Sequence, residues 1–226
     1  FLPETAQWQN FSEVLFESPM VRYIGNSLFV SVCTVAIQVV TGAMIAYAIV
    51  FMRFRGRKML FAVIMATYML PTAATYVPSY IILSNWNLLN TYTGLIISNA
   101  VSIFGIFLLR QAFMQVPAGL VEAAKIDGAN AWQRIKLITF PMIRPSFTIS
   151  LFLTLSNSFK LFDQNLALTN GGPGNATQML ALNIYQTAFS YNKMNLAQAK
   201  AVIFFVFVCI ITLVQVYMTK KDEVEA

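Results

Sequence analysis

The 226-residue chain has no histidine, only two cysteines and few charged residues. Without histidine, the commonest general base and the commonest metal ligand are missing, so we expect no catalytic residue and no metal site. Cys33 and Cys209 both lie inside apolar runs, which favours two small apolar side chains over a disulfide framework. These absences leave nothing to support a membrane enzyme.

The chain is richer in apolar residues than a typical soluble domain. Hydrophobic residues make up 58% and charged residues 11% of it, against about 45–50% and about 25% in a typical soluble domain. No charge occurs in 27–52, 59–109 or 201–219, and about 20 apolar residues suffice to cross a bilayer. The composition therefore predicts an all-α polytopic membrane protein. The expected spans are 27–52, 59–83, 93–113, 145–166 and 197–218.

Positive charge is distributed unevenly between the loops. Four Lys or Arg lie in 53–58, five in 110–144 and two in the tail 219–226, whereas 1–26, 84–92 and 167–196 hold only Arg22 and Lys193. Because cytoplasmic loops carry the excess of Lys and Arg, segment 1–26 is expected outside the cell and the C-terminus in the cytoplasm. This placement explains the net charge of +6 without a nucleic-acid partner. The chain begins at Phe1 rather than Met, and we expect a first span to be missing before it.

Two prolines lie inside the second expected span. Pro71 and Pro78 each remove a helix hydrogen bond, and such breaks are tolerated in membranes where they face protein or a cavity. One interpretation is a bent helix that lines a pathway, and the other is ordinary helix irregularity.

The hydrophilic segment 114–144 separates the third and fourth expected spans. Pro117 suits a first helical turn, residues 122–125 read Glu-Ala-Ala-Lys, which favours helix, and Gly128 is expected to break that helix. A second amphipathic piece around Trp132 should end at Pro141. The segment is thus predicted to form two short helices joined at a glycine, either facing another protein or lying on the bilayer.

This segment resembles the EAA loop of ABC importer permeases. The matching residues, at the family's spacing, are Glu122, Ala123, Ala124, Gly128, Ile138 and Pro141, with Phe140 in place of the usual Leu. Residues 88–92, 104–111, 123–129 and 168–173 are also similar to carbohydrate-importer permeases of the maltose-transport type, and the resemblance extends from about 20 to 218.

The resemblance implies a transport subunit rather than an enzyme. It implies the type I permease fold of six or more spans, in a bacterial inner membrane, with a related second permease, two ATPase subunits and an extracellular sugar-binding protein. ATP and Mg²⁺ would be held by the ATPases, since this chain has no phosphate-binding loop and no cofactor is expected in it. The residues expected to couple to the ATPase are Glu122, Ala123, Ala124, Asp127, Gly128 and Pro141.

Polar residues inside the fourth expected span are candidates for a sugar pathway, because such groups are costly in a membrane. The candidates are Asn157, Phe159, Lys160, Asp163 and Gln164, with Tyr76 added from the second span. Lys160 and Asp163 are spaced for an i,i+3 pair, which could instead lie at the outer interface. With Lys160 as the one strongly buried cation, a neutral oligosaccharide is preferred. The alternatives are an ABC permease for glycerol phosphate or amino acids, and an ion-coupled secondary transporter.

Overall fold

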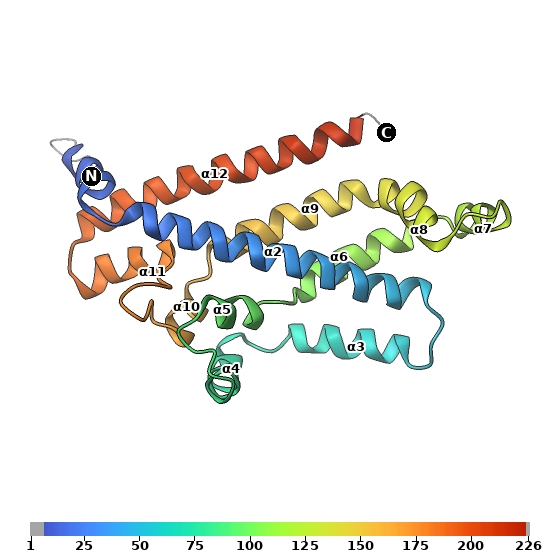
Figure 1. Ribbon diagram of the computed structural model, residues 1–226, viewed down its shortest axis with the longest axis horizontal. Helices are drawn as coiled ribbons and strands as arrows, with labels where there is room; N and C mark the ends of the chain where they lie inside the picture. The colour runs from blue at the N-terminus through green and yellow to red at the C-terminus, as the bar shows by residue number, and fades with distance from the viewer. Residues whose placement is uncertain (1–6, 225–226) are drawn as a thin grey trace. The chain divides into compact units, whose positions relative to one another are not determined.

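The computed structural model of the chain describes residues 7–224, with side chains to 220. The described residues are helical and contain no strand, which confirms the all-α prediction (Figure 1). Residues 1–6 and 225–226, parts of the expected outer segment 1–26 and tail 219–226, lie outside the described residues. The elements are α1 (Gln9–Ser12), a π turn (Glu13–Glu17), α2 (Met20–Phe51), α3 (Arg57–Tyr68), α4 (Ala73–Asn85), α5 (Tyr92–Ser98), α6 (Ile103–Met114), α7 (Ala118–Ile126), α8 (Ala131–Arg134), a π turn (Ile135–Thr139), α9 (Phe140–Phe159), α10 (Asp163–Leu168), α11 (Leu180–Tyr185), a π turn (Gln186–Ser190) and α12 (Met194–Val224).

Within the described residues, three helical stretches are long and apolar enough to cross a membrane: Met20–Phe51, Ala131–Phe159 and Met194–Lys220. Two interrupted pairs, α3 with α4 and α5 with α6, also qualify if each pair is one span. The total of three to five candidate spans agrees with a polytopic helical membrane protein.

The second expected span is not one bent helix but two helices. The helix ends at Tyr68 and restarts at Ala73, with Pro71 in the break, while α4 continues through Pro78. Proline cannot donate the hydrogen bond that an interior helical position requires, and at Pro71 that loss coincides with the end of the helix.

The third expected span, 93–113, is covered by two helices with a break between them, and the pair qualifies as one candidate span. Helix α5 ends at Ser98 and α6 begins at Ile103, although no proline or glycine occurs in between. Side chains of α2 bond to the carbonyls of this break: Gln38 Nε2 donates to Asn99, and Thr41 Oγ1 donates to Ala100 at 3.0 Å. Freed backbone groups at membrane depth need such partners, and the sequence alone does not show them.

The helix at the fourth expected span begins and ends earlier than the expected range 145–166. The π turn at 135–139, in which the Phe140 N–H bonds to the Ile135 carbonyl, leads directly into α9. Pro141 therefore does not stop the helix as expected, because the wider turn shifts the hydrogen-bond register just before the ring. The helix then ends at Phe159 rather than at 166.

The chain divides into two compact units. Within the described residues, unit 1 comprises 7–33, 75–98 and 156–211, and unit 2 comprises 34–74, 99–155 and 212–224. Unit 1 has two clusters of buried side chains, one around Met20 and Leu180 and the other around Leu95 and Met179. Unit 2 has one cluster around Leu109 and Phe113. Each unit thus has a core that supports its own candidate site.

Candidate functional site

Unit 2 presents the two short helices expected in segment 114–144. Helix α7 ends in a Schellman motif: the Gly128 N–H donates to the Lys125 carbonyl (3.2 Å), and the Ala129 N–H donates to the Ala124 carbonyl (2.9 Å). This motif requires the left-handed conformation that Gly128 adopts, with φ +86°. Two residues later, a capping box between Asn130 and Gln133 starts α8. Local hydrogen bonds therefore define both sides of the bend, as the glycine predicted.

The α7–α8 segment exposes both charge and apolar surface. Glu122, Ala123, Asp127 and Gly128 are exposed and Ala124 is half-buried. Large apolar side chains on the same segment are exposed too, with Ile126 at 85% and Trp132 at 69%. An exposed apolar patch rimmed by charge is typical of a surface that another protein or a membrane covers. Pro141 lies apart from these residues, half-buried in the first turn of α9.

The six residues expected to form a solute pathway all lie in unit 1, but they differ in exposure. Asn157, Lys160 and Asp163 are exposed, whereas Tyr76 and Gln164 are half-buried. Phe159 is fully buried and packs edge-on against Phe207, with ring centroids 5.6 Å apart. Its ring therefore supports the core of unit 1 and is not open to stack against a sugar in this structure.

The expected pairing of Lys160 with Asp163 does not form. The chain leaves the helix after Phe159 and re-enters it at Asp163, so the two residues are not on consecutive turns of one helix. Lys160 is also exposed rather than buried. The reasoning that made it the buried cation of the chain is therefore wrong.

Among the described side chains, the buried cation is Lys200, on the second turn of α12, with 7% of its surface exposed. Its ammonium donates to Asn183 Oδ1 and to Thr187 Oγ1, both at 2.8 Å. Its third N–H has no partner among the described residues. The sequence carried a signal for this site, because an ionisable residue at the start of the uncharged run 201–219 is a functional candidate by default.

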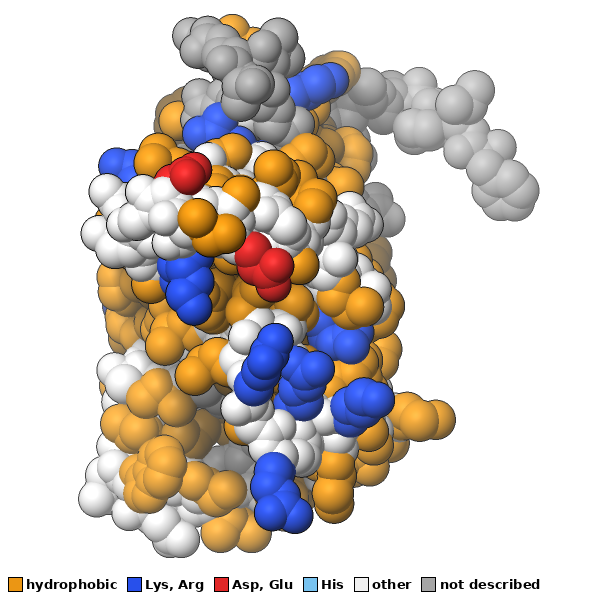
Figure 2. All heavy atoms as spheres, turned by 90° about the vertical axis from the view of Figure 1, so that its right-hand side faces the viewer, with side chains coloured by type: hydrophobic (Ala, Val, Ile, Leu, Met, Phe, Trp, Pro, Cys, Tyr) orange, Lys and Arg blue, Asp and Glu red, His pale blue; other side chains and the backbone are white. Residues whose placement is uncertain are grey.

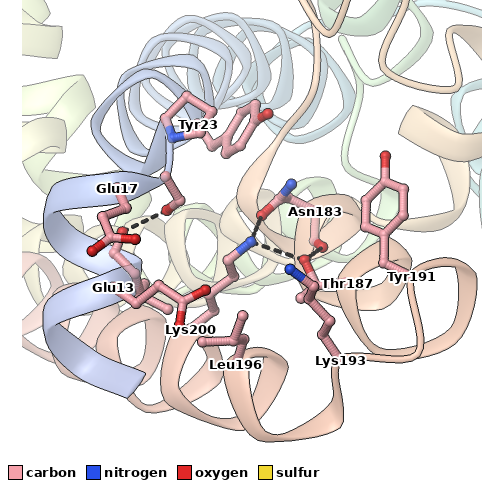
Figure 3. A pocket seen from close by; sticks show the side chains of 12 residues that line it. Glu13, Glu17, Tyr23, Asn183, Thr187, Tyr191, Lys193, Leu196 and Lys200 are labelled. Carbon is pink, nitrogen blue, oxygen red and sulfur yellow. Dashed lines mark hydrogen bonds between the residues drawn. The ribbon is translucent and has the colours of Figure 1, made fainter. Parts of the chain in front are cut away.

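Lys200 lines a pocket of about 550 Å³ in unit 1. Figure 3 shows Glu13 and Glu17 on one side of it, Asn183, Thr187 and Tyr191 on the other, and the Lys200 ammonium between them. The remaining polar lining is Ser18, Tyr23 and Lys193. The pocket therefore offers carboxylate, ammonium, amide and hydroxyl groups beside aromatic rings. Such a set can form many hydrogen bonds to a polyhydroxylated solute. No residue in the expected solute pathway lines this pocket.

Long-range hydrogen bonds hold α11, which supplies Asn183, against α2. Asn26 Nδ2 donates to the Ala176 carbonyl (2.9 Å), and the Tyr92 hydroxyl donates to Asn26 Oδ1 (2.7 Å). Ser27 Oγ accepts from the Leu180 N–H, at the start of α11 (2.9 Å). Because all of these groups belong to unit 1, the pocket is formed on a cross-linked scaffold rather than on a loose loop.

The chain matches the profile of one protein family over residues 38–221, described as binding-protein-dependent transport system inner membrane component. It is 54% identical over 136 residues to the probable starch degradation products transport system permease protein of Thermoanaerobacterium thermosulfurigenes, covering 59% of this chain and 47% of that protein. It is 37% identical over 119 residues to the multiple sugar-binding transport system permease protein of Streptococcus mutans, covering 53% and 41%. The chain thus spans about half the length of these relatives or less.

Among solved structures, the fold is similar to a chain of a bacterial ABC transporter involved in the import of the acidic polysaccharide alginate. The TM-score is 0.80 at 20% sequence identity, covering 98% of this chain and 86% of that one. At this identity the similarity shows a shared fold.

Proposed function

Since the chain belongs to the family of binding-protein-dependent transport system inner membrane components, we propose that it is a permease subunit of an ATP-driven sugar importer. It would form the translocation path with a second, related permease. Two ATPase subunits would supply the energy, and an extracellular binding protein would deliver the sugar. The hydrolysis itself belongs to those ATPases, and the C-terminus faces them in the cytoplasm.

The observation that carries this proposal is the exposed α7–α8 segment. It joins a helix bearing Glu122 to a second helix through a defined left-handed turn at Gly128. Ile126 and Trp132 stand exposed beside these charges. A rigid bend with charged and apolar contacts can fit a cleft on a partner protein and transmit its motion as a rigid body. An ion-coupled carrier does not need such a surface.

For the solute, we propose an oligosaccharide. The relative with 54% identity is named for starch degradation products, and another relative is named for multiple sugars. The pocket around Lys200 supports the same class, because it combines Glu13, Asn183 and Tyr191 in one polar cavity. Because Lys160 is exposed, it gives no support for a neutral solute, and the solute class rests on the named relatives and on the pocket around Lys200.

The test is ATP hydrolysis by the complex that co-purifies with the full-length permease. Glu122→Lys and Gly128→Asp are expected to abolish association with the ATPase or to uncouple hydrolysis from transport. Gln9→Lys is the matched control, since it introduces a lysine at an exposed position outside both the α7–α8 segment and the lining of the pocket around Lys200, and it should leave the ATPase bound. If no ATPase co-purifies and uptake follows an ion gradient, the proposal is wrong.

The solute is tested with the same complex in liposomes. Maltooligosaccharides, in the presence of the binding protein, should be taken up at the expense of ATP. Uptake of sn-glycerol 3-phosphate instead would retain the ABC importer but replace its solute class.

A further inference from the structure

A second pocket, of about 320 Å³, lies in unit 2 and has a different character. Three cations line it: Arg57 and Lys58 at the start of α3, and Arg110 near the end of α6. The other lining residues are apolar: Ile49, Val50, Phe61 and Met114. No acidic residue lines it, so this basic pocket combines uncompensated positive charge with hydrocarbon walls.

The sequence offers these cations no nearby carboxylate. No Asp or Glu occurs between Glu17 and Glu122, a stretch that includes all of the pocket's residues. Among the side chains described, from 7 to 220, none of the three cations forms an ion pair. Positive groups gathered without a counter-ion repel one another, and an anion from outside the chain would relieve that repulsion.

Arg110 is oriented and yet incompletely bonded. Its guanidinium carbon lies 4.0 Å from the centroid of the Phe61 ring, a cation–π contact, and its buried Nε has no hydrogen-bond partner. Arg57 makes one long contact, from Nη1 to the Val50 carbonyl at 3.5 Å. Both guanidinium groups therefore keep N–H donors available for an oxyanion.

The pocket also lies where candidate spans end. Helix α2 ends at Phe51, α3 begins at Arg57 and α6 ends at Met114. Figure 2 shows Lys and Arg side chains gathered beside hydrophobic ones on the face of the molecule that includes this end of unit 2. Span ends lie at the depth of lipid headgroups, where a phosphate can reach the cations while its acyl chains contact the apolar walls.

We propose that this basic pocket binds an anionic phospholipid. The phosphate would interact with Arg57, Lys58 and Arg110, and the first acyl carbons would contact Val50, Phe61 and Met114. A lipid fits better than an acidic segment of a partner protein, because the apolar groups lie in the same cavity as the charges and the cavity is small. The site is separate from the α7–α8 segment, and its occupancy does not depend on which solute is carried.

The experiment is native mass spectrometry of the full-length permease in a neutral detergent, with equal amounts of phosphatidylglycerol and phosphatidylcholine. Wild type should retain phosphatidylglycerol preferentially. The double variant Arg57→Gln/Lys58→Gln should bind it about ten- to thirty-fold more weakly. The matched control is Arg53→Gln/Arg55→Gln, which removes the same charge from exposed positions of the same connection and should retain the lipid.

A swap that keeps both charges, Arg57→Lys/Lys58→Arg, should bind phosphatidylglycerol nearly as tightly as wild type. This result would show that the loss of lipid in the neutral variant comes from the missing charge and not from a folding defect. The proposal is overturned if wild type shows no preference for phosphatidylglycerol, or if both neutral double variants lose it equally. It is also overturned if the pocket variant keeps the lipid and instead loses a co-purifying ATPase, since the occupant would then be a protein.

Discussion

Replacing Gly128 by alanine tests whether the bend between α7 and α8 depends on one backbone conformation. Gly128 has φ +86°, and a Cβ built there meets no atom within 4 Å. The substitution therefore introduces no clash, and its whole effect comes from holding a side chain in the left-handed region. Gly119, also in α7, has open space around its Cβ position too and no positive φ, which makes Gly119→Ala the matched control.

The expected size of the Gly128→Ala effect follows from the free-energy cost of the left-handed backbone conformation. An L-residue in the left-handed region costs about 1–2 kcal/mol, which lowers the population of the bent state roughly five- to thirty-fold relative to competing conformations. Asparagine tolerates this region better, so Gly128→Asn should lower the population of the bent state less than Gly128→Ala does. At Gly119 the same change removes glycine from a helix and should stabilise it by about 0.5–1 kcal/mol.

The local readout is amide hydrogen exchange at Ala129, whose N–H closes the Schellman motif on the Ala124 carbonyl at 2.9 Å. Gly128→Ala should accelerate this exchange by the factor given above, Gly128→Asn by less, and Gly119→Ala not at all. Coupled ATP hydrolysis in the full complex should fall in the same order. Equal exchange in Gly128→Ala and Gly119→Ala would refute the argument, because the left-handed turn would then carry no cost.

Three further predictions concern the hydrogen bonds of one side chain each and use melting temperatures and unfolding free energies of the purified permease. Thr187→Val removes one acceptor from the buried Lys200 ammonium and should lower the free energy of unfolding by about 1.5–3 kcal/mol, the range for a bond to a charged group. The same change at the exposed Thr67 should lower it by less than about 0.5 kcal/mol. Tyr92→Phe removes a hydroxyl bonded at 2.6 and 2.7 Å and should cost about 1–2 kcal/mol, and an equal loss for Tyr80→Phe would contradict it. Thr41→Val leaves a carbonyl between α5 and α6 without this partner and should cost about 1 kcal/mol; a neutral result would show that water or another group can satisfy that carbonyl.

Much of the fold could be read from local pattern. Long uncharged runs predicted helices, since a backbone in lipid must satisfy its own hydrogen bonds. The bend at Gly128 was also predictable, because a glycine after a strong helix former is typical of a helix end. The residues expected to couple to the ATPase, from Glu122 to Gly128, were predicted from the resemblance to the EAA loop, and their role stays a prediction. They lie on one continuous stretch of sequence, so their spacing fixes their local geometry.

The pathway candidates show where such reasoning fails. Lys160 was expected to be buried because it falls within the expected span 145–166, but the helix ends one residue before it and leaves it exposed. Lys200 stands at the start of the uncharged run 201–219, which marks it as a candidate, but its burial was not predictable because its two acceptors come from residues 13 and 17 positions away. Burial of an ionisable side chain depends on which distant groups approach it, and sequence pattern does not contain that information.

The sequence by itself thus determined the helical class, the polar connection and the uneven distribution of charge, because each follows from hydrogen bonding and hydrophobicity within a short stretch. Tertiary structure decided the break between α5 and α6, the pocket around Lys200 and the basic pocket around Arg110. Each of these depends on side chains brought together from separate helices, such as Thr41 with the carbonyl of Ala100 or Arg110 with the ring of Phe61.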